Sequence, residues 1–202
     1  MKKNSPEVDL LSKSTSSKGI EDEVRNWLTT IVIGLNLCPF AQREYKRNKI
    51  RFKTSLAENE QEIVTDLAVE LSLLSKQEEI ETSLLILPMA LAEFEYFNDF
   101  LGLADTLLEE MNLDGVFQIA SFHPDYRFAG TNNDDAENYT NRAPYPVLHI
   151  LRESSLDWAI DEHPDTDQIP LNNIALMNKL GVEHMRKMLA DCFTSDDSTG
   201  DD

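Results

Sequence analysis

Cysteine, histidine and glutamate residues that could do chemistry occur in three short stretches of the chain. Cys38 lies in the sequence CPFA, His123 directly follows an apolar run, and His149 precedes Glu153 by four residues. A cysteine thiolate is a strong nucleophile, and histidine exchanges a proton near neutral pH. We therefore predict that these four residues are catalytic, as a nucleophile, a general acid or base, and a supporting pair.

The surroundings of Cys38 fit two roles. Proline is favoured at the first position of a helix, so Pro39 predicts a short helix with Cys38 as its N-cap, where backbone dipoles favour a thiolate. The alternative is a small buried side chain at the end of the preceding helix, which is common for free cysteines. Cys192 is expected to have no catalytic or binding role. Two cysteines so far apart in the chain provide neither a disulfide framework nor a four-cysteine zinc site.

The histidines also leave alternatives open. Pro124 keeps His123 out of helical geometry, so its ring is expected to project at the edge of a sheet. There it could act as a general base or metal ligand. The alternative is that it hydrogen-bonds the backbone of the following loop. On a helix predicted over 145–158, His149 and Glu153 share one face and could bind a metal together with His123. The spacing matches no strong zinc motif, so we predict an orienting pair and no metal site.

The elements that must position these residues follow from apolar periodicity. Short apolar or alternating runs, separated by amphipathic stretches, predict an α/β fold with a small, at least partly parallel three-stranded sheet and a long functional loop before two C-terminal helices. The predicted strands are about 50–54, 83–88 and 116–121. The predicted helices are about 20–36, 58–76, 94–111, 145–158 and 169–191.

The long loop, residues 121–144, has no clear periodicity and is rich in aromatic residues. Structureless loops above roughly 15 residues are uncommon in compact domains unless they are functional or disordered. Arg142 precedes a predicted helix N-terminus, where a guanidinium and free amides can hold a carboxylate or phosphate. We predict that Arg127, Asn141 and Tyr145 contact the same substrate, the alternative being that the arginines tie the loop together through its acidic residues.

Three blocks of sequence carry a resemblance. CPFA at 38–41, FHPDYRFAGT at 122–131 and NRAPYPVLHILRE at 141–153 resemble the family called domain of unknown function 1415. The resemblance implies a shared site in these blocks without supplying a reaction.

Charge and length limit the classes of partner. The chain has 202 residues, of which 18 are basic and 37 acidic, giving a net charge of −19 that repels nucleic acids and anionic lipids. No apolar run approaches the roughly 20 residues of a membrane span, so a cytoplasmic protein without nucleic-acid or membrane partners is predicted. A basic island between Arg43 and Lys53 could attract an anionic molecule. We expect one domain over 20–193, between flexible tails at 1–19 and 194–202.

The leading hypothesis is an enzyme, a hydrolase or group transferase, that acts on a small anionic metabolite where the three blocks meet. The first alternative is a noncatalytic ligand- or protein-binding module. The second is a metalloprotein that uses His123, His149 and Glu153. The sequence leaves the reaction, the substrate, any cofactor and the oligomeric state open, and it contains neither a P-loop nor a GxGxxG motif.

Overall fold

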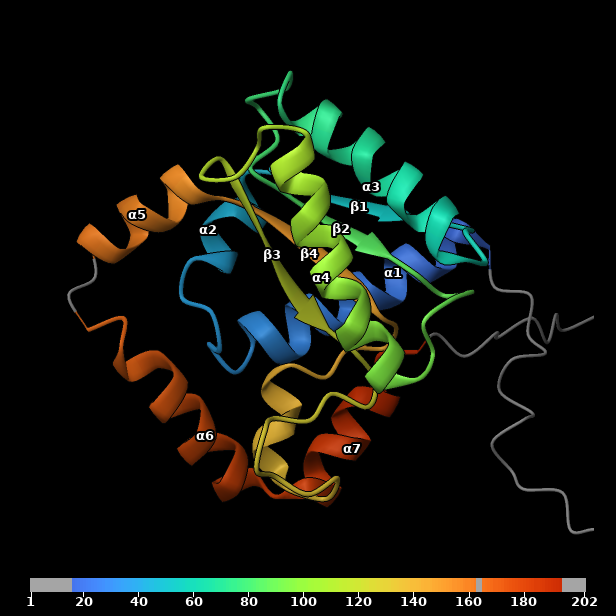
Figure 1. The fold of residues 1–202 in the computed structure, drawn as a ribbon. Coiled ribbons are helices and arrows are strands. Elements are labelled where there is room, and N and C mark those ends of the chain that lie inside the picture. The colour runs from blue at the N-terminus through green and yellow to red at the C-terminus, as the bar shows by residue number, and fades with distance from the viewer. Residues whose placement is uncertain (1–15, 163–164, 194–202) are drawn as a thin grey trace, which may run out of the picture.

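The computed structural model describes residues 16–162 and 165–193, within which the chain forms a mixed α/β fold around a four-stranded sheet (Figure 1). The strand order is β1 (Ile50–Thr54), β2 (Thr82–Ile86), β4 (Val147–Arg152) and β3 (Phe117–Phe122). β1 and β2 are parallel, whereas β4 is antiparallel to β2 and β3. The predicted α/β class and partly parallel sheet are therefore confirmed.

The prediction of three strands and of a helix over 145–158 is wrong, because residues 147–152 form β4. In this segment Val147 and His149 point to one face of the sheet while Leu148 and Ile150 point to the other, and the apolar members of both sets are fully buried. A strand buried on both faces has no polar alternation, so its apolar run is indistinguishable from a helix by periodicity. The helix that does form here, α5, spans Glu153–Glu162.

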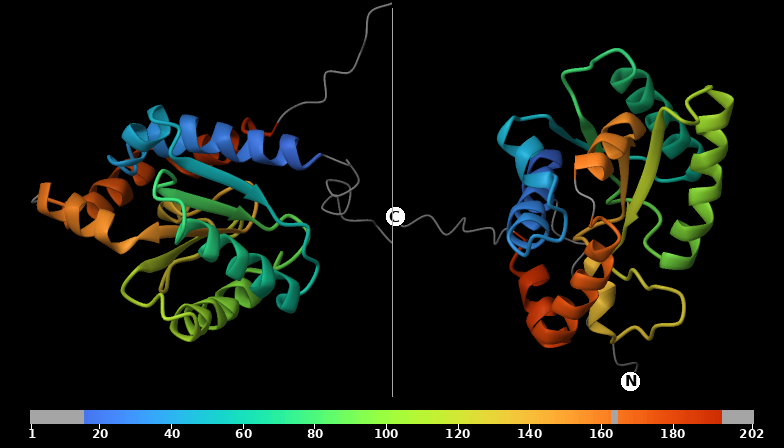
Figure 2. Two further views of the ribbon diagram at one scale, coloured as in Figure 1. Left: turned by 90° about the horizontal axis from the view of Figure 1, so that it is seen from above. Right: turned by 90° about the vertical axis from the view of Figure 1, so that its left-hand side faces the viewer.

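Two helices cover one face of the sheet. α3 (Glu60–Leu74) makes the crossover between the parallel strands β1 and β2, and α4 (Phe94–Glu110) packs beside it. Ile63, Leu67 and Leu71 of α3 recur every four residues and are completely buried, as their helical spacing predicts. Seen from above in Figure 2, these helices lie on one side of the sheet and α1 (Ser17–Trp27) lies on the other.

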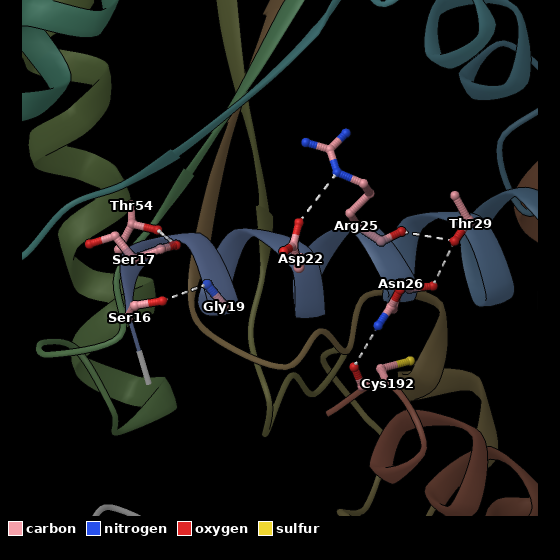
Figure 3. Close-up of polar contacts among 9 residues, drawn as sticks. All are labelled: Ser16, Ser17, Gly19, Asp22, Arg25, Asn26, Thr29, Thr54 and Cys192. Carbon is pink, nitrogen blue, oxygen red and sulfur yellow. Dashed lines mark hydrogen bonds and ion pairs between the residues drawn. The ribbon is translucent and has the colours of Figure 1, made fainter. Parts of the chain in front are cut away.

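The predicted first helix, 20–36, is in fact α1 followed by a π-helical turn, η2 (Leu28–Ile33). The Thr29 hydroxyl donates to the Arg25 carbonyl oxygen at 2.9 Å (Figure 3), and the Thr30 hydroxyl donates to the Asn26 carbonyl oxygen at 2.6 Å. These contacts compete with the backbone amides of a regular helix. The turn ends at Gly34, where a Cβ atom would lie 2.2 Å from a backbone oxygen. α1 also begins within the predicted tail, because Ser16 caps it; residues 1–15 and 194–202 of the tails lie outside the described residues.

The remaining helices complete the α1 side of the molecule. The predicted helix over 169–191 is divided at Gly181, whose φ of +81° ends one helix and starts the next. Met177 and Met185, one from each half, are completely buried in the core that α1 shares with the sheet. These helices are α6 (Gln168–Leu180) and α7 (Val182–Ala190), and the shorter helices are α2 (Ala41–Lys46) and the 3-10 helix η3 (Ala136–Thr140).

Candidate functional site

A pocket of about 280 Å³ lies between the α1 side of the sheet, the turn at residues 38–41 and helix α5. We call it the sheet pocket. Most of its surface is apolar, and its walls include Leu28, Val32, Leu84, Phe122, Leu151 and Ala159. Leu28 and Val32 belong to the π-helical turn η2, a type of helix distortion that often occurs at functional sites.

The floor of the sheet pocket follows from strand alternation. Side chains two residues apart on a strand share a face, so each of three neighbouring strands contributes a pair. Leu84 lies opposite His149, and His149 lies opposite Ala120, so these residues form one row across the sheet. The pairs are Thr82 and Leu84 of β2, His149 and Leu151 of β4, and Ala120 and Phe122 of β3.

His149 is the ionisable group in the floor of the sheet pocket. Its Nε2 atom lies 2.7 Å from the hydroxyl oxygen of Thr82, and Phe122 packs against its ring at 6.0 Å between centroids. Burial lowers the pKa of His149 from its usual 6.5 to about 4, because the charged imidazolium would lose its hydration. The ring is therefore neutral at pH 7.

Cys38 borders the same pocket as His149. It is a free, partly buried cysteine, but it is not the N-cap of a helix: α2 begins at Ala41, and its N-cap is Phe40. Instead, Cys38 stays in the turn before the helix, and its carbonyl oxygen accepts a hydrogen bond from the Ala41 amide at 3.3 Å. The N-cap prediction is thus wrong, because the helix starts two residues after Pro39.

Glu44 and Arg43, which we did not predict as site residues, also border the sheet pocket. Arg43 Nε lies 2.5 Å from Glu44 Oε1, and the Arg43 guanidinium stacks on Trp158 of α5 at 4.2 Å. Glu44 Oε2 is buried and has no hydrogen-bond partner among the described residues. One feature of the sequence could have indicated that Glu44 is unusual: it is the only acidic residue between Arg43 and Lys53.

The basic island divides between the two faces of the sheet. Arg43 and Arg47 both lie near the Glu44 carboxylate, whereas Arg51 forms a 2.5 Å ion pair with Glu70 on the opposite face. Three of its six cations therefore have an acidic neighbour, which weakens the field that the island offers to an anion.

His123 lies on the opposite face of the sheet from His149. It is completely buried between Phe94 and Phe97 of α4, and its Nε2 atom lies 3.0 Å from the Leu91 carbonyl oxygen. Its Nδ1 atom accepts a hydrogen bond from the Asp125 amide at 3.0 Å. These contacts are those of the alternative prediction, a histidine that fixes the start of the loop. Burial lowers the pKa of His123 as well.

Glu153 does not pair with His149 in the way we predicted. The two residues would share a face on a helix, but β4 is extended through Arg152, so roughly 13 Å of strand separates positions four apart. Glu153 instead begins α5, and its amide donates to the Val116 carbonyl oxygen at 3.0 Å. The expected orienting pair is therefore absent.

The four predicted substrate contacts lie away from the sheet pocket. Arg142 Nε and Nη2 donate to the Tyr126 and Asn133 carbonyl oxygens at 3.2 and 2.8 Å, and its guanidinium stacks on Tyr139 at 4.6 Å. The element that follows Arg142 is not a helix, because Pro144 leads into β4. Arg142 therefore ties the loop together, although through carbonyl groups rather than the acidic residues of the alternative prediction.

The other three residues also contact protein groups. Arg127 lies 3.2 Å from Glu95 and from Asn133, both on the surface. Asn141 donates to the Ser121 carbonyl oxygen at 3.2 Å, and the Tyr145 hydroxyl donates to Glu23 at 2.5 Å. The structure thus brings Cys38 and His149 together at one pocket and places the other predicted site residues elsewhere. The substrate-binding roles of these residues stay predictions.

The contacts of Arg142 predict a structural effect of its removal. Arg142→Ala should lower the free energy of unfolding by about 1 to 3 kcal/mol, because two charge-assisted hydrogen bonds and a stacked ring are lost. Urea denaturation measures this difference. The matched control is Arg127→Ala, which removes an exposed ion pair and should cost less than about 1 kcal/mol. Equal losses in the two variants would contradict the structural role of Arg142.

The described residues show neither a metal cluster nor a membrane span. Among them, no three or more histidine, cysteine, aspartate or glutamate side chains come close enough to hold a metal ion. None of the helices at residues 16–162 and 165–193 is long and apolar enough to cross a bilayer.

A family model described as "Protein of unknown function (DUF1415)" matches residues 19–187 of the chain, which confirms the resemblance found in the sequence. No curated protein and no solved structure matches it.

Proposed function

Because the chain belongs to the DUF1415 family, whose description supplies no activity, we propose from the site alone that the protein binds a small, largely apolar molecule in the sheet pocket. The observation that carries this proposal is the pocket itself: about 280 Å³ of space with mostly apolar walls and a few polar atoms. Small-molecule sites in proteins commonly have this composition.

The size of the sheet pocket indicates the size of the ligand. An engineered apolar cavity of about 150 Å³ holds one benzene molecule. The sheet pocket has nearly twice that volume, about 280 Å³, so a molecule of two fused or linked rings, or a branched chain of similar bulk, would fit. Binding would remove apolar surface of both partners from water, which favours association by roughly 25 cal/mol for each Å² buried.

An anionic ligand is supported less well than an apolar one. The two arginines that border the pocket are already engaged: Arg43 by Glu44 and Trp158, and Arg152 by carbonyl groups that include those of Leu74 and Ile80. A carboxylate or phosphate would also approach Glu44 and Glu81, which line the same space. The small anionic metabolite predicted from the sequence would therefore find no arginine without a partner among the residues that line this pocket.

Catalysis is the second candidate function, since Cys38 and His149 border one pocket. A thiol nucleophile and a histidine are the parts of a hydrolase or group transferase. However, an imidazole with a pKa of about 4 is a weak base near pH 7 and would not hold a thiolate as an imidazolium partner. Ligand binding is for this reason the function that the site supports better.

Filling the pocket tests the proposed function. In Ala120→Leu and Ala159→Leu, added side-chain bulk enters the sheet pocket from the floor and from α5 respectively. Both variants should bind the neutral fluorescent dye N-phenyl-1-naphthylamine about tenfold more weakly than the unsubstituted protein, or not at all. The measurement is the saturable rise of dye fluorescence on titration, with the melting temperature of each variant taken to establish folding.

The matched control is Ala175→Leu, which adds the same bulk to an exposed position of α6 and should leave dye binding unchanged. Dye binding of equal strength in all four folded proteins would contradict the proposal, as would the absence of saturable binding to the unsubstituted chain.

A further inference from the structure

We infer that the ligand of the sheet pocket is uncharged and carries a hydroxyl or similar hydrogen-bond donor on its apolar body, which it donates to Nδ1 of His149. This inference rests on the proposed function and adds the chemical class of the ligand. The hydrogen bonds of Thr82, His149 and Glu44 support this class of ligand.

The Thr82 hydroxyl determines which nitrogen of His149 carries the proton. Its oxygen lies 2.6 Å from the Ile150 carbonyl oxygen and 2.7 Å from His149 Nε2. A hydroxyl has one hydrogen, and a carbonyl oxygen can only accept, so the hydrogen goes to Ile150. The contact with His149 then requires that Nε2–H donates to the Thr82 oxygen. Since the ring is neutral, Nδ1 is left as an acceptor with a free lone pair.

The Nδ1 atom of His149 is open to the pocket. No described residue donates a hydrogen bond to it, and among the described residues the buried side-chain atoms without a partner consist of Glu44 Oε2 alone. Nδ1 therefore lies on accessible surface, and the partly exposed His149 ring borders the sheet pocket. An acceptor in a mostly apolar wall favours a ligand that supplies one donor.

Glu44 points to the same class of ligand. Its side chain lines the pocket, and its buried Oε2 atom is a second acceptor without a partner among the described residues. The torsion of a carboxylate group is soft enough to turn this atom toward a donor. The guanidinium groups of Arg43 and Arg152 already have acceptors. Two acceptors without a hydrogen-bond partner among the described residues, His149 Nδ1 and Glu44 Oε2, thus belong to side chains that line the pocket, and they favour a ligand that donates over an anion.

Three probes of similar size test this inference: 2-naphthol, 2-methoxynaphthalene and naphthalene. The unsubstituted protein should bind 2-naphthol about three- to tenfold more tightly than either of the other two, which is the contribution of one hydrogen bond. In His149→Phe, which keeps an aromatic ring but has no acceptor, this preference should disappear while naphthalene binding remains. Thr82 keeps Ile150 as its acceptor in this variant, so the fold should survive.

Isothermal titration at pH 7.5 measures the three dissociation constants, and melting temperatures establish that His149→Phe is folded. Equal affinity of the unsubstituted protein for all three probes would overturn the donor inference but leave the proposed function intact. A preference for 2-naphthol that persists in His149→Phe would overturn the role of Nδ1. If none of the probes binds, the proposed function itself fails.

Discussion

Leu85→Ala should lower the free energy of unfolding by about 2 to 5 kcal/mol, the cost of a large cavity in a well-packed core. Leu85 lies in β2, between β1 and β4, and is completely buried in the core formed with α3 and α4. Its side chain points away from the sheet pocket, which lies on the other face. Urea denaturation at pH 7.5 measures the loss, and the folded variant should still bind N-phenyl-1-naphthylamine with unchanged affinity.

The control for this prediction is Val69→Ala on α3, where the side chain is 60% exposed and little should change. A shift of Leu85→Ala no larger than that of Val69→Ala would mean that β2 is not central. Loss of dye binding by the folded Leu85→Ala variant would mean that the two faces of the sheet are not independent.

The second large effect is a pH dependence of stability that comes from His149. Its pKa is about 4 in the folded protein and about 6.5 when unfolded, so the unfolded chain binds more protons between these values. The stabilisation from a neutral His149 is therefore complete above pH 6.5 and is lost as the pH falls toward 4. Between pH 7.5 and 5 the loss should reach about 2 kcal/mol, or somewhat less if water in the pocket hydrates the charged ring.

Comparison with His149→Phe isolates this contribution, because His123 and the carboxylates titrate in both proteins. The free energy of unfolding of the unsubstituted protein should fall more steeply with decreasing pH than that of the variant, and their difference should change by about 2 kcal/mol across the range. Parallel pH profiles would show that His149 is hydrated in the folded state.

Much of the fold could be predicted from periodicity. The strand expected at about 50–54 coincides with β1, and the helices expected at 58–76 and 94–111 contain α3 and α4. β4 could not be predicted in the same way, because both of its faces are buried and its apolar run lacks alternation. The π-helical turn depends on the hydroxyl contacts of Thr29 and Thr30, which no periodicity reveals.

Because residues 147–152 form a strand and not the predicted helix, the candidate site in the structure also differs from the predicted one. A helix over 145–158 would place His149 beside Glu153 and near His123. Phe122, the last residue of β3, and His123, which follows it, face opposite sides of the sheet, so only Phe122 joins His149 at the pocket. The sequence marked Cys38 and His149 by residue type, but Thr82 and Glu44 acquire their importance from hydrogen bonds that form only in the folded chain.

We propose that the ligand site is the sheet pocket and not the loop at 121–144. The most direct measurement is a titration of the ¹⁵N-labelled protein with N-phenyl-1-naphthylamine, followed by amide chemical shifts. We predict that the largest changes fall on the rows of β2, β3 and β4 at the pocket floor, at Thr82, Ala120 and His149. Changes concentrated around Arg127 and Arg142, with the pocket amides unmoved, would contradict the account.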